Sequence, residues 1–204
     1  MPGHIYSPKT LIKLIHGWIY RLILPVLSRA PGRIENGEFN TVNRWNIIHG
    51  LEDFRAGIHG KVLDVGAGTW EFPRKQLEGV CEYTSTDTFE HPNVDVICNI
   101  QELSSCFHPD TFDFVICTDV IEHVEKPWVA VKELFAILKP GGELLLTTPF
   151  HYPLHGNQYV HDYWRFTQDG LRQLLEEEAG FREVKITFLG HPKNPFSYTV
   201  IARK

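Results

Sequence analysis

The stretch from Lys61 to Trp70, KVLDVGAGTW, constrains the fold of this chain more than any other. Its first half is a run of apolar, mostly β-branched residues with one carboxylate, Asp64, and the run stops at Gly66–Gly68. Such a run is typical of a buried parallel strand, and the glycines allow a tight turn that a ligand can approach closely. Glu71 to Leu77 then has helical spacing, with Pro73 in the first turn, where a missing N–H costs little. Strand, glycine turn and helix in this order predict a nucleotide cradle.

Beyond this stretch, strand-like and helix-like segments alternate along the chain. This alternation predicts a three-layer α/β fold with right-handed crossovers. The last two strands are separated by so short a loop that they should be antiparallel neighbours. The expected strands are residues 62–65, 82–87, 94–99, 112–118, 143–148, 184–189 and 198–202, and the expected helices are 71–77, 128–138, 167–179 and a short one within 35–60.

The formal charge is unevenly distributed. The whole chain carries −5 at pH 7, but residues 1–34 carry +5 and no acid, so the remaining 170 residues carry −10. An acidic body argues against general binding of nucleic acid through phosphate neutralisation. We therefore expect two parts, a basic arm at 1–34 and a globular domain at 35–204.

The basic arm contains an amphipathic pattern. From Thr10 to Leu27 it is rich in Leu and Ile, with Lys13 and Arg21 on one helical face. These cations interrupt the segment too often for a membrane span, which needs about 20 apolar residues. Two interpretations stay open: a helix in a membrane interface with Trp18 at headgroup depth, and a helix packed over the globular domain.

The four cysteines form no C-x-x-C pair, which argues against a zinc site. Cys98 and Cys117 lie in apolar, strand-like runs, where a small buried thiol is the simplest interpretation. Cys81 and Cys106 complete the set. This usage suggests a reducing compartment.

Four motifs stand in an order that one enzyme family shows. Asp64-Val-Gly66-Ala-Gly68 follows a strand, Asp87 ends the next strand, FDFV at 112–115 leads to DVIEH at 119–123, and LKPGG at 138–142 precedes a strand. Over roughly residues 45–204 the chain thereby resembles the class I S-adenosylmethionine-dependent methyltransferases, in a type 11-like subgroup. The resemblance implies a Rossmann-like, seven-stranded, mostly parallel sheet with the last strand antiparallel, and S-adenosyl-L-methionine as cofactor.

The resemblance also implies the residues of the cofactor site. Asp87 would accept hydrogen bonds from the two ribose hydroxyls, although it could instead cap a turn. Asp64 would support the glycine turn and the ligand's ammonium group, or the turn alone. Asn99 would contact the adenine, or only stabilise a turn. The complete expected set is Asp64, Gly66, Ala67, Gly68, Trp70, Asp87, Thr88, Asn99, Ile100, Thr118 and Asp119.

The glycine pattern distinguishes this cofactor from a dinucleotide. A dinucleotide fold has G-x-G-x-x-G so that the backbone can pass a pyrophosphate, and Glu71 here would place a carboxylate against phosphate. Trp70 stands where many methyltransferases have a third glycine. We expect its ring to pack beside the amino-acid end of the cofactor or to close the pocket.

Methylation of a hydroxyl or a protonated amine requires a group that takes up a proton. Histidine, with an unperturbed pKa of about 6.5, is suited to this. His123 is the first candidate because it follows the fourth strand by a short turn, and His151 and His161 are further catalytic candidates in the loop after the fifth strand. His155 also borders the expected acceptor pocket.

The same loop raises the alternative of a divalent metal ion. His151-x3-His155 and His161-Asp162 could supply ligands, but the spacing is that of a loop and no His-Glu-x-x-His helix is present, so no metal is expected. We interpret the loop as a lid with an aromatic wall. The alternative is structural: Trp164 and Phe166 would pack the final helix, and Asp162 would pair with Arg165. The wall residues are Tyr152, Tyr159, Tyr163, Trp164 and Phe166.

Together these features favour transfer of a methyl group to oxygen or nitrogen of an acceptor that is a small molecule or is linked to a glycan or lipid. The glycan or lipid option comes from His161 to Thr167, which resembles a segment of bacterial methyltransferases of cell-envelope and glycan biosynthesis. We expect a cytoplasmic protein with peripheral membrane contact through residues 1–34. A non-catalytic cofactor-binding scaffold is the main alternative, and a nucleotide-dependent oxidoreductase is disfavoured by Glu71.

Overall fold

The computed structural model describes residues 32–35, 38–55 and 57–204 of the chain. The expected basic helix at Thr10–Leu27 lies outside the described residues. The chain divides into two units, residues 1–42 and 43–204. In the first unit, β1 (Gly32–Glu35) and β2 (Glu38–Thr41) form an antiparallel hairpin.

The second unit is built on a seven-stranded sheet, and its strands within the described residues have the order β5-β4-β3-β6-β7-β9-β8. The strands from β5 to β7 pair in parallel, while β9 is antiparallel to both its neighbours. The expectation of a mostly parallel sheet with an antiparallel last strand is therefore confirmed. The strands are β3 (Lys61–Val65), β4 (Glu82–Asp87), β5 (Val96–Ile97), β6 (Phe112–Thr118), β7 (Leu138–Pro149), β8 (Arg182–His191) and β9 (Asn194–Arg203).

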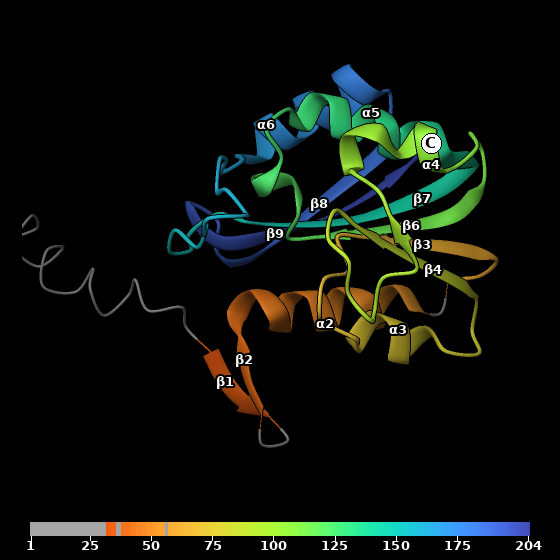
Figure 1. Ribbon diagram of the computed structural model, residues 1–204. Helices are drawn as coiled ribbons and strands as arrows, with labels where there is room; N and C mark the ends of the chain where they lie inside the picture. Colours follow the sequence, from red (N-terminus) through yellow and green to blue (C-terminus); the bar gives the residue numbers. More distant parts are fainter. Residues whose placement is uncertain (1–31, 36–37, 56) are drawn as a thin grey trace, which may run out of the picture. The chain divides into compact units, whose positions relative to one another are not determined.

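Helices cover both faces of this sheet, which confirms the three layers (Figure 1). One face carries α2 and α3, and the other carries α4, α5 and α6. Among the described helices none is long and apolar enough to cross a lipid bilayer. The helical segments are α2 (Val42–Arg55), α3 (Phe72–Leu77), η1 (Ile100–Glu102), α4 (Leu103–Cys106), η2 (Ile121–His123), α5 (Pro127–Ile137), α6 (Gln168–Arg172) and the π-helical η3 (Gln173–Ala179).

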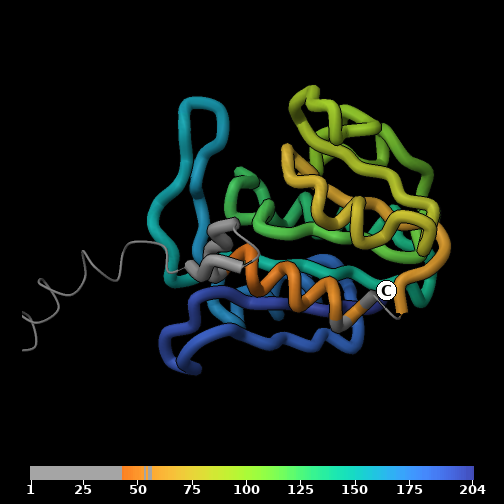
Figure 2. Tube along the Cα trace, turned by 90° about the horizontal axis from the view of Figure 1, so that it is seen from below, coloured from red at the N-terminus to blue at the C-terminus, as the bar shows by residue number. Residues whose placement is uncertain are grey.

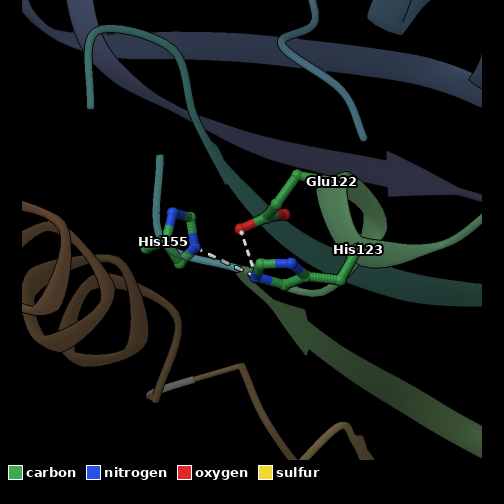
Figure 3. A group of neighbouring side chains, drawn as sticks. All are labelled: Glu122, His123 and His155. Atoms are coloured by element: carbon green, nitrogen blue, oxygen red, sulfur yellow. Dashed lines mark hydrogen bonds and ion pairs between the residues drawn. The ribbon is translucent and has the colours of Figure 1, made fainter. Parts of the chain in front are cut away.

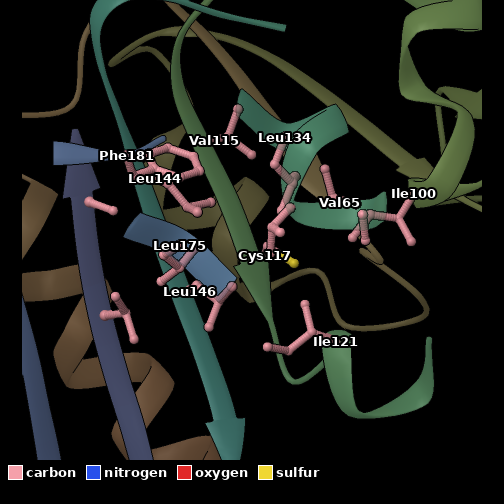
Figure 4. Close-up of a cluster of buried hydrophobic side chains, with 14 of the residues drawn as sticks. Val65, Ile100, Val115, Cys117, Ile121, Leu134, Leu144, Leu146, Leu175 and Phe181 are labelled. Atoms are coloured by element: carbon pink, nitrogen blue, oxygen red, sulfur yellow. The ribbon is translucent and has the colours of Figure 1, made fainter. Parts of the chain in front are cut away.

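Alternation along the central strands separates two apolar clusters. Val115 and Cys117 of β6 face one side and pack with Leu134 of α5 (Figure 4). Phe114 and Ile116 face the other side and pack towards the α2 and α3 layer. All four are almost fully buried, and complete burial of one such aliphatic or aromatic side chain stabilises the fold by about 1.5–3 kcal/mol. This continuous burial explains why β6 is apolar on both faces.

The structure differs from expectation at the cysteines. Cys98 and Cys106 form a disulfide bond, so the interpretation of Cys98 as a free buried thiol is wrong. The short helices η1 and α4 reverse the chain between them and bring their Cα atoms to 6.5 Å. Cys81 and Cys117 are free thiols, and burial raises the pKa of both.

Several elements also differ in extent: β7, β8 and β9 are longer than expected, and β5 is shorter. The edge strand β5 has only two residues. Before it, the Asp95 carboxylate rather than a backbone carbonyl accepts the Ser85 N–H, and after it Asn99 already caps η1. The last helix starts at its expected cap, Thr167, whose hydroxyl accepts from the Gly170 N–H, but it widens to a π-helix from Gln173.

Candidate active site

A cavity of about 590 Å³ lies at the carboxyl ends of β3, β4 and β6. The chain order of the sheet reverses between β3 and β6, since β4 follows β3 on one side and β6 lies on the other. Open α/β sheets bind their ligands at such a reversal, outside the carboxyl ends of the strands. The volume is within the range of small-molecule pockets.

The glycine turn after β3 forms the floor of one end of this cavity. Gly66 and Ala67 both donate their N–H groups to the Thr86 carbonyl oxygen, at 2.8 and 3.2 Å. Gly66 has φ +74°, and a Cβ atom there would stand 2.4 Å from Cγ2 of Val120. The turn therefore needs glycine at position 66 for both its dihedral angle and its space.

Asp87 is held beside the turn by main-chain donors. Its Oδ2 accepts the Gly68 N–H at 3.0 Å, and its Oδ1 accepts the Thr88 N–H at 2.6 Å. Both residues line the cavity with Asp87. Oδ1 also accepts the Thr88 hydroxyl at 3.2 Å and the Phe89 N–H at 3.3 Å, so the group is fixed in place. Oδ2 keeps a further lone pair and can still accept from a ligand.

Asn99 and Ile100 form another wall of the cavity. The side-chain oxygen of Asn99 caps η1 by accepting the Gln101 N–H at 2.9 Å. The NH₂ group of Asn99 is the part that can donate to a ligand. Asn99 is thus both a turn residue and a wall residue, whereas Ile100 adds apolar surface.

Some expected cofactor residues are not among the lining residues. Asp64 faces the opposite side of the sheet from Val65, where it is buried and accepts the Tyr83 hydroxyl at 2.5 Å. Burial raises the pKa of Asp64 to about 7, against the opposing effect of the Tyr83 hydrogen bond. Ala67 lies between the two lining glycines, and Thr118 ends β6 just before the lining residue Asp119.

Trp70 also lies outside the lining. Its ring stacks on Phe72 with centroids 5.2 Å apart, and the Arg44 guanidinium lies 5.1 Å from the ring centroid. Trp70 therefore packs beside the first turn of α3, half-buried between an aromatic ring and a cation. The expectation that it packs at the amino-acid end of the cofactor stays a prediction.

The opposite end of the cavity is lined by Asp119, His123, His161 and the phenol-bearing side chains of Tyr159 and Tyr163. Asp119 has φ +53° and accepts the Thr147 hydroxyl, and burial raises its pKa. The loop of residues 150–166, which extends away from the sheet in Figure 2, supplies the last three of these residues.

His123 is the centre of a small polar cluster. Its Nδ1 lies 2.6 Å from the His161 carbonyl oxygen, and its Nε2 lies 3.0 Å from Nε2 of His155. Glu122 Oε1 lies 3.7 Å from the same Nε2. Burial raises the pKa of Glu122 well above its usual range, with an added effect from Asp119, and burial lowers the pKa of His123.

The histidines of the loop have different places. His155 contacts His123, and His161 lines the cavity. His151 instead packs its ring on Phe196, and its backbone N–H donates to the Pro195 and Phe196 carbonyl oxygens. The structure thus brings two of the three expected catalytic histidines, His123 and His161, to the cavity, whereas His155 contacts His123 without being among the lining residues.

Glu122 was not expected at the site. A sequence signal exists, because an acid directly after the apolar Val120-Ile121 pair is unusual for an exposed turn, but spacing alone cannot show that it is buried.

The structural alternative for the loop is confirmed in part. Arg165 forms an ion pair with Asp162, and this pairing lowers the pKa of Asp162 to about 2. Phe166 is buried in the apolar cluster of the last helix. Trp164 instead donates its indole N–H to the Val124 carbonyl oxygen at 2.8 Å.

Comparison with known proteins places this site in a family. A family profile described as "Methyltransferase domain" matches residues 17–186. The ubiquinone biosynthesis O-methyltransferase of Idiomarina loihiensis is 30% identical over 129 residues, 55% of this chain and 53% of that protein. The protein of the same name from Pseudomonas aeruginosa is 26% identical over 175 residues, 71% of this chain and 74% of that protein.

Solved structures share the fold. The 1,6-didemethyltoxoflavin-N1-methyltransferase of Burkholderia thailandensis, solved with 1,6-didemethyltoxoflavin and S-adenosylhomocysteine, has a TM-score of 0.62 at 20% identity over 100% of this chain and 93% of that chain. A SAM-dependent methyltransferase from Archaeoglobus fulgidus has a TM-score of 0.61 at 18% identity, over 80% of this chain and 95% of that chain.

The profile match covers more than half of the chain, and the strand order, the glycine turn and the acid at the end of β4 agree with it. The chain belongs to the class I S-adenosylmethionine-dependent methyltransferases.

Proposed function

We propose that this methyltransferase alkylates the oxygen of a hydroxyl group on a small-molecule acceptor, with nitrogen as the second choice of acceptor atom. The observation that carries the proposal is the continuity of one cavity, which has the glycine turn and Asp87 at one end and imidazole and phenol side chains at the other. Oxygen is preferred because the curated relatives are named O-methyltransferases.

The cofactor end fits S-adenosylmethionine. Asp87 presents a fixed carboxylate to vicinal hydroxyls, and Gly66 and Gly68 line the cavity where an amino-acid tail would lie. Asn99 with Ile100 offers a donor and an apolar surface to a purine. When bound, the cofactor supplies an electrophilic methyl group on a sulfonium sulfur together with its own leaving group. The chain's task is then to place the acceptor and to handle its proton.

The acceptor end of the cavity has residues suited to placing the acceptor and to taking up its proton. Tyr159 and Tyr163 offer aromatic edges and hydroxyl groups to a flat or ring-containing molecule. Because Nδ1 of His123 faces a carbonyl oxygen, its proton is on Nδ1, and Nε2 presents a lone pair. His123 is therefore the residue through which this end of the cavity would withdraw the proton of an acceptor hydroxyl.

The experiment is methyl transfer from labelled S-adenosylmethionine by the full-length chain, with catechol- and hydroquinone-type phenols, primary amines and a cell extract as acceptors. We expect label on a phenolic or alcoholic oxygen, identified by mass spectrometry of the product. Calorimetry should show binding of S-adenosylhomocysteine at micromolar strength. Cofactor binding without transfer to any acceptor, including those in the extract, would support the non-catalytic alternative and defeat the proposal.

A matched pair of variants tests the acceptor end. His123→Ala should lower kcat by about 100-fold or more, the usual contribution of a proton-transfer group, with a much smaller change in the affinity for S-adenosylhomocysteine. His108→Ala removes an exposed histidine that is not among the lining residues and should leave both unchanged. Unchanged turnover in His123→Ala would move the proton acceptor to the 150–166 loop.

A further inference from the structure

Three side chains near the acceptor end converge on one point. Figure 3 shows Glu122 and His123 of η2 facing His155 of the loop. One carboxylate oxygen and two imidazole nitrogens, one ligand atom from each residue, lie within 4.8 Å of one another. Sequence spacing had suggested His155 together with other loop residues as ligands, and it could not show that the loop returns to η2.

The hydrogen bonds around the two imidazoles determine where their protons lie. Nδ1 of His123 faces the His161 carbonyl oxygen at 2.6 Å. Nδ1 of His155 faces two acceptors, the Pro153 carbonyl oxygen at 3.2 Å and an Asp162 carboxylate oxygen at 3.3 Å. Each neutral imidazole has one N–H, and these surroundings assign it to Nδ1. Both Nε2 lone pairs then point at each other across 3.0 Å, which repels them unless a positive charge lies between.

The buried side chain of Glu122 gives a second, independent indication of a cation at this point. Its side chain is fully buried, and its Oε1 has no hydrogen-bond partner, while its other oxygen, Oε2, is 3.3 Å from the Thr148 hydroxyl. A buried carboxylate oxygen without a partner is costly, and a cation is the group that would satisfy it. The same Oε1 lies 3.7 Å from Nε2 of His123, on the side where the two imidazoles meet.

We propose that Glu122, His123 and His155 bind a divalent transition-metal ion of the zinc class, which holds the acceptor's oxygen. Two imidazoles and one carboxylate form the ligand set of catalytic zinc sites, with a further position open for water or substrate. Ligand atoms about 2.0–2.2 Å from such an ion stand roughly 3.3 Å apart in tetrahedral geometry. The two separations that involve His123, 3.0 and 3.7 Å, bracket that value, and all three ligand atoms lie within 4.8 Å of one another, so His155 would adjust its position to complete the site.

The residues behind the ligands also suit a metal site. Metal-bound histidines as a rule donate their other N–H to a carbonyl or a carboxylate, which orients the ring. His123 has the His161 carbonyl and His155 has the Asp162 carboxylate in this position, and Arg165 fixes Asp162 in turn. The ion's role in placing the acceptor rests on the proposed function, whereas its binding does not. With the ion bound, Nε2 of His123 would be a ligand and no longer a free base, and the ion would instead lower the pKa of the acceptor hydroxyl so that its proton passes to water.

The test uses the full-length chain and the metal alone. After treatment with a chelator, the protein is titrated with Zn²⁺ by calorimetry and with Co²⁺ by visible absorption, without cofactor or acceptor. We expect one ion per chain. His155→Ala and Glu122→Gln should each weaken binding by more than the roughly 10–100-fold typical of losing an outer-shell partner, because they remove direct ligands.

His151→Ala is the matched control, because His151 belongs to the same loop but packs on Phe196. It should bind the ion like the original chain, and all variants should still bind S-adenosylhomocysteine, which shows that they are folded.

Zn²⁺ or Co²⁺ binding that is no tighter in the original chain than in His155→Ala would overturn the proposal and leave a shared proton between the imidazoles as the explanation. Methyl transfer that survives chelation would overturn the ion's role and leave the proposed function standing. Metal binding without any methyl transfer would defeat the proposed function and leave the metal site standing.

Discussion

Gly66→Ala tests whether the glycine turn is required by space as well as by dihedral angle. At φ +74° an alanine costs about 1–2 kcal/mol, and about 0.4–1 kcal/mol of this is offset because alanine restricts the unfolded chain. The new Cβ would also stand 2.4 Å from Cγ2 of Val120, an overlap of the kind that destabilises a packed site by about 1–3 kcal/mol. We therefore expect a loss of about 2–4 kcal/mol in the free energy of unfolding.

Two further variants separate the contributions. Gly79 has nearly the same dihedral angle, φ +71°, and no atom within 4 Å of a built Cβ, so Gly79→Ala should lose only about 1 kcal/mol. Val120→Ala removes the methyl groups that a Cβ at position 66 would meet. The double variant with Gly66→Ala should be more stable than the sum of the single changes predicts, by about 1–3 kcal/mol.

The measurement is urea unfolding of the four variants, followed by fluorescence and circular dichroism at one pH. Calorimetry with S-adenosylhomocysteine on the same proteins shows whether the turn also loses its ligand. The reasoning fails if Gly66→Ala costs no more than Gly79→Ala, or if the Val120→Ala background leaves the cost unchanged.

The remaining predictions concern other parts of the chain. Asp87→Ala should weaken S-adenosylhomocysteine binding by at least about tenfold, since each hydrogen bond to a charged group contributes about 1.5–3 kcal/mol, and unchanged affinity in calorimetry would place the ribose elsewhere. The folded pKa of Asp64 is raised from 3.8 to about 7, so its ionisation destabilises the fold as pH rises through this window, by at most about 4 kcal/mol; Asp64→Asn should lack this loss when unfolding is compared at pH 5 and pH 8. Deletion of residues 1–34 should abolish flotation with anionic liposomes if that arm is a membrane anchor, and equal flotation of both chains would exclude it.

Most of the fold could be predicted because the central strands β3 and β6 are buried on both faces. The apolar run of β6 and the glycine stop of β3 are local signals, and the structure has both strands where the sequence places them. The sequence could also have predicted which face of the sheet carries Asp64, because alternation along β3 puts it on the face opposite Val65. The motif resemblance had assigned Asp64 to the ligand instead.

The disulfide bond and the acceptor end could not be predicted in the same way. The pairing of Cys98 with Cys106 depends on how η1 and α4 turn between them, and no periodicity specifies that turn. The contact of His123 with His155 depends on a loop that returns across more than thirty residues of chain. Such contacts follow from hydrogen bonds between distant main-chain groups, which leave no pattern of side chains in the sequence.

The main-chain bonds that hold the 150–166 loop are different from those that hold the cofactor end of the cavity. The loop is attached to η2 because Tyr163 and Trp164 donate their backbone N–H groups to the Glu122 carbonyl oxygen at 2.8 and 3.1 Å. The side chain of Tyr159 takes no part in this attachment, yet it lines the cavity. Substitutions at the tip of the loop can therefore reshape the acceptor end while η2 and its imidazole stay in place. The glycine turn and Asp87 are instead held by the register of β3, β4 and β6, so changes in the loop should leave S-adenosylhomocysteine binding intact.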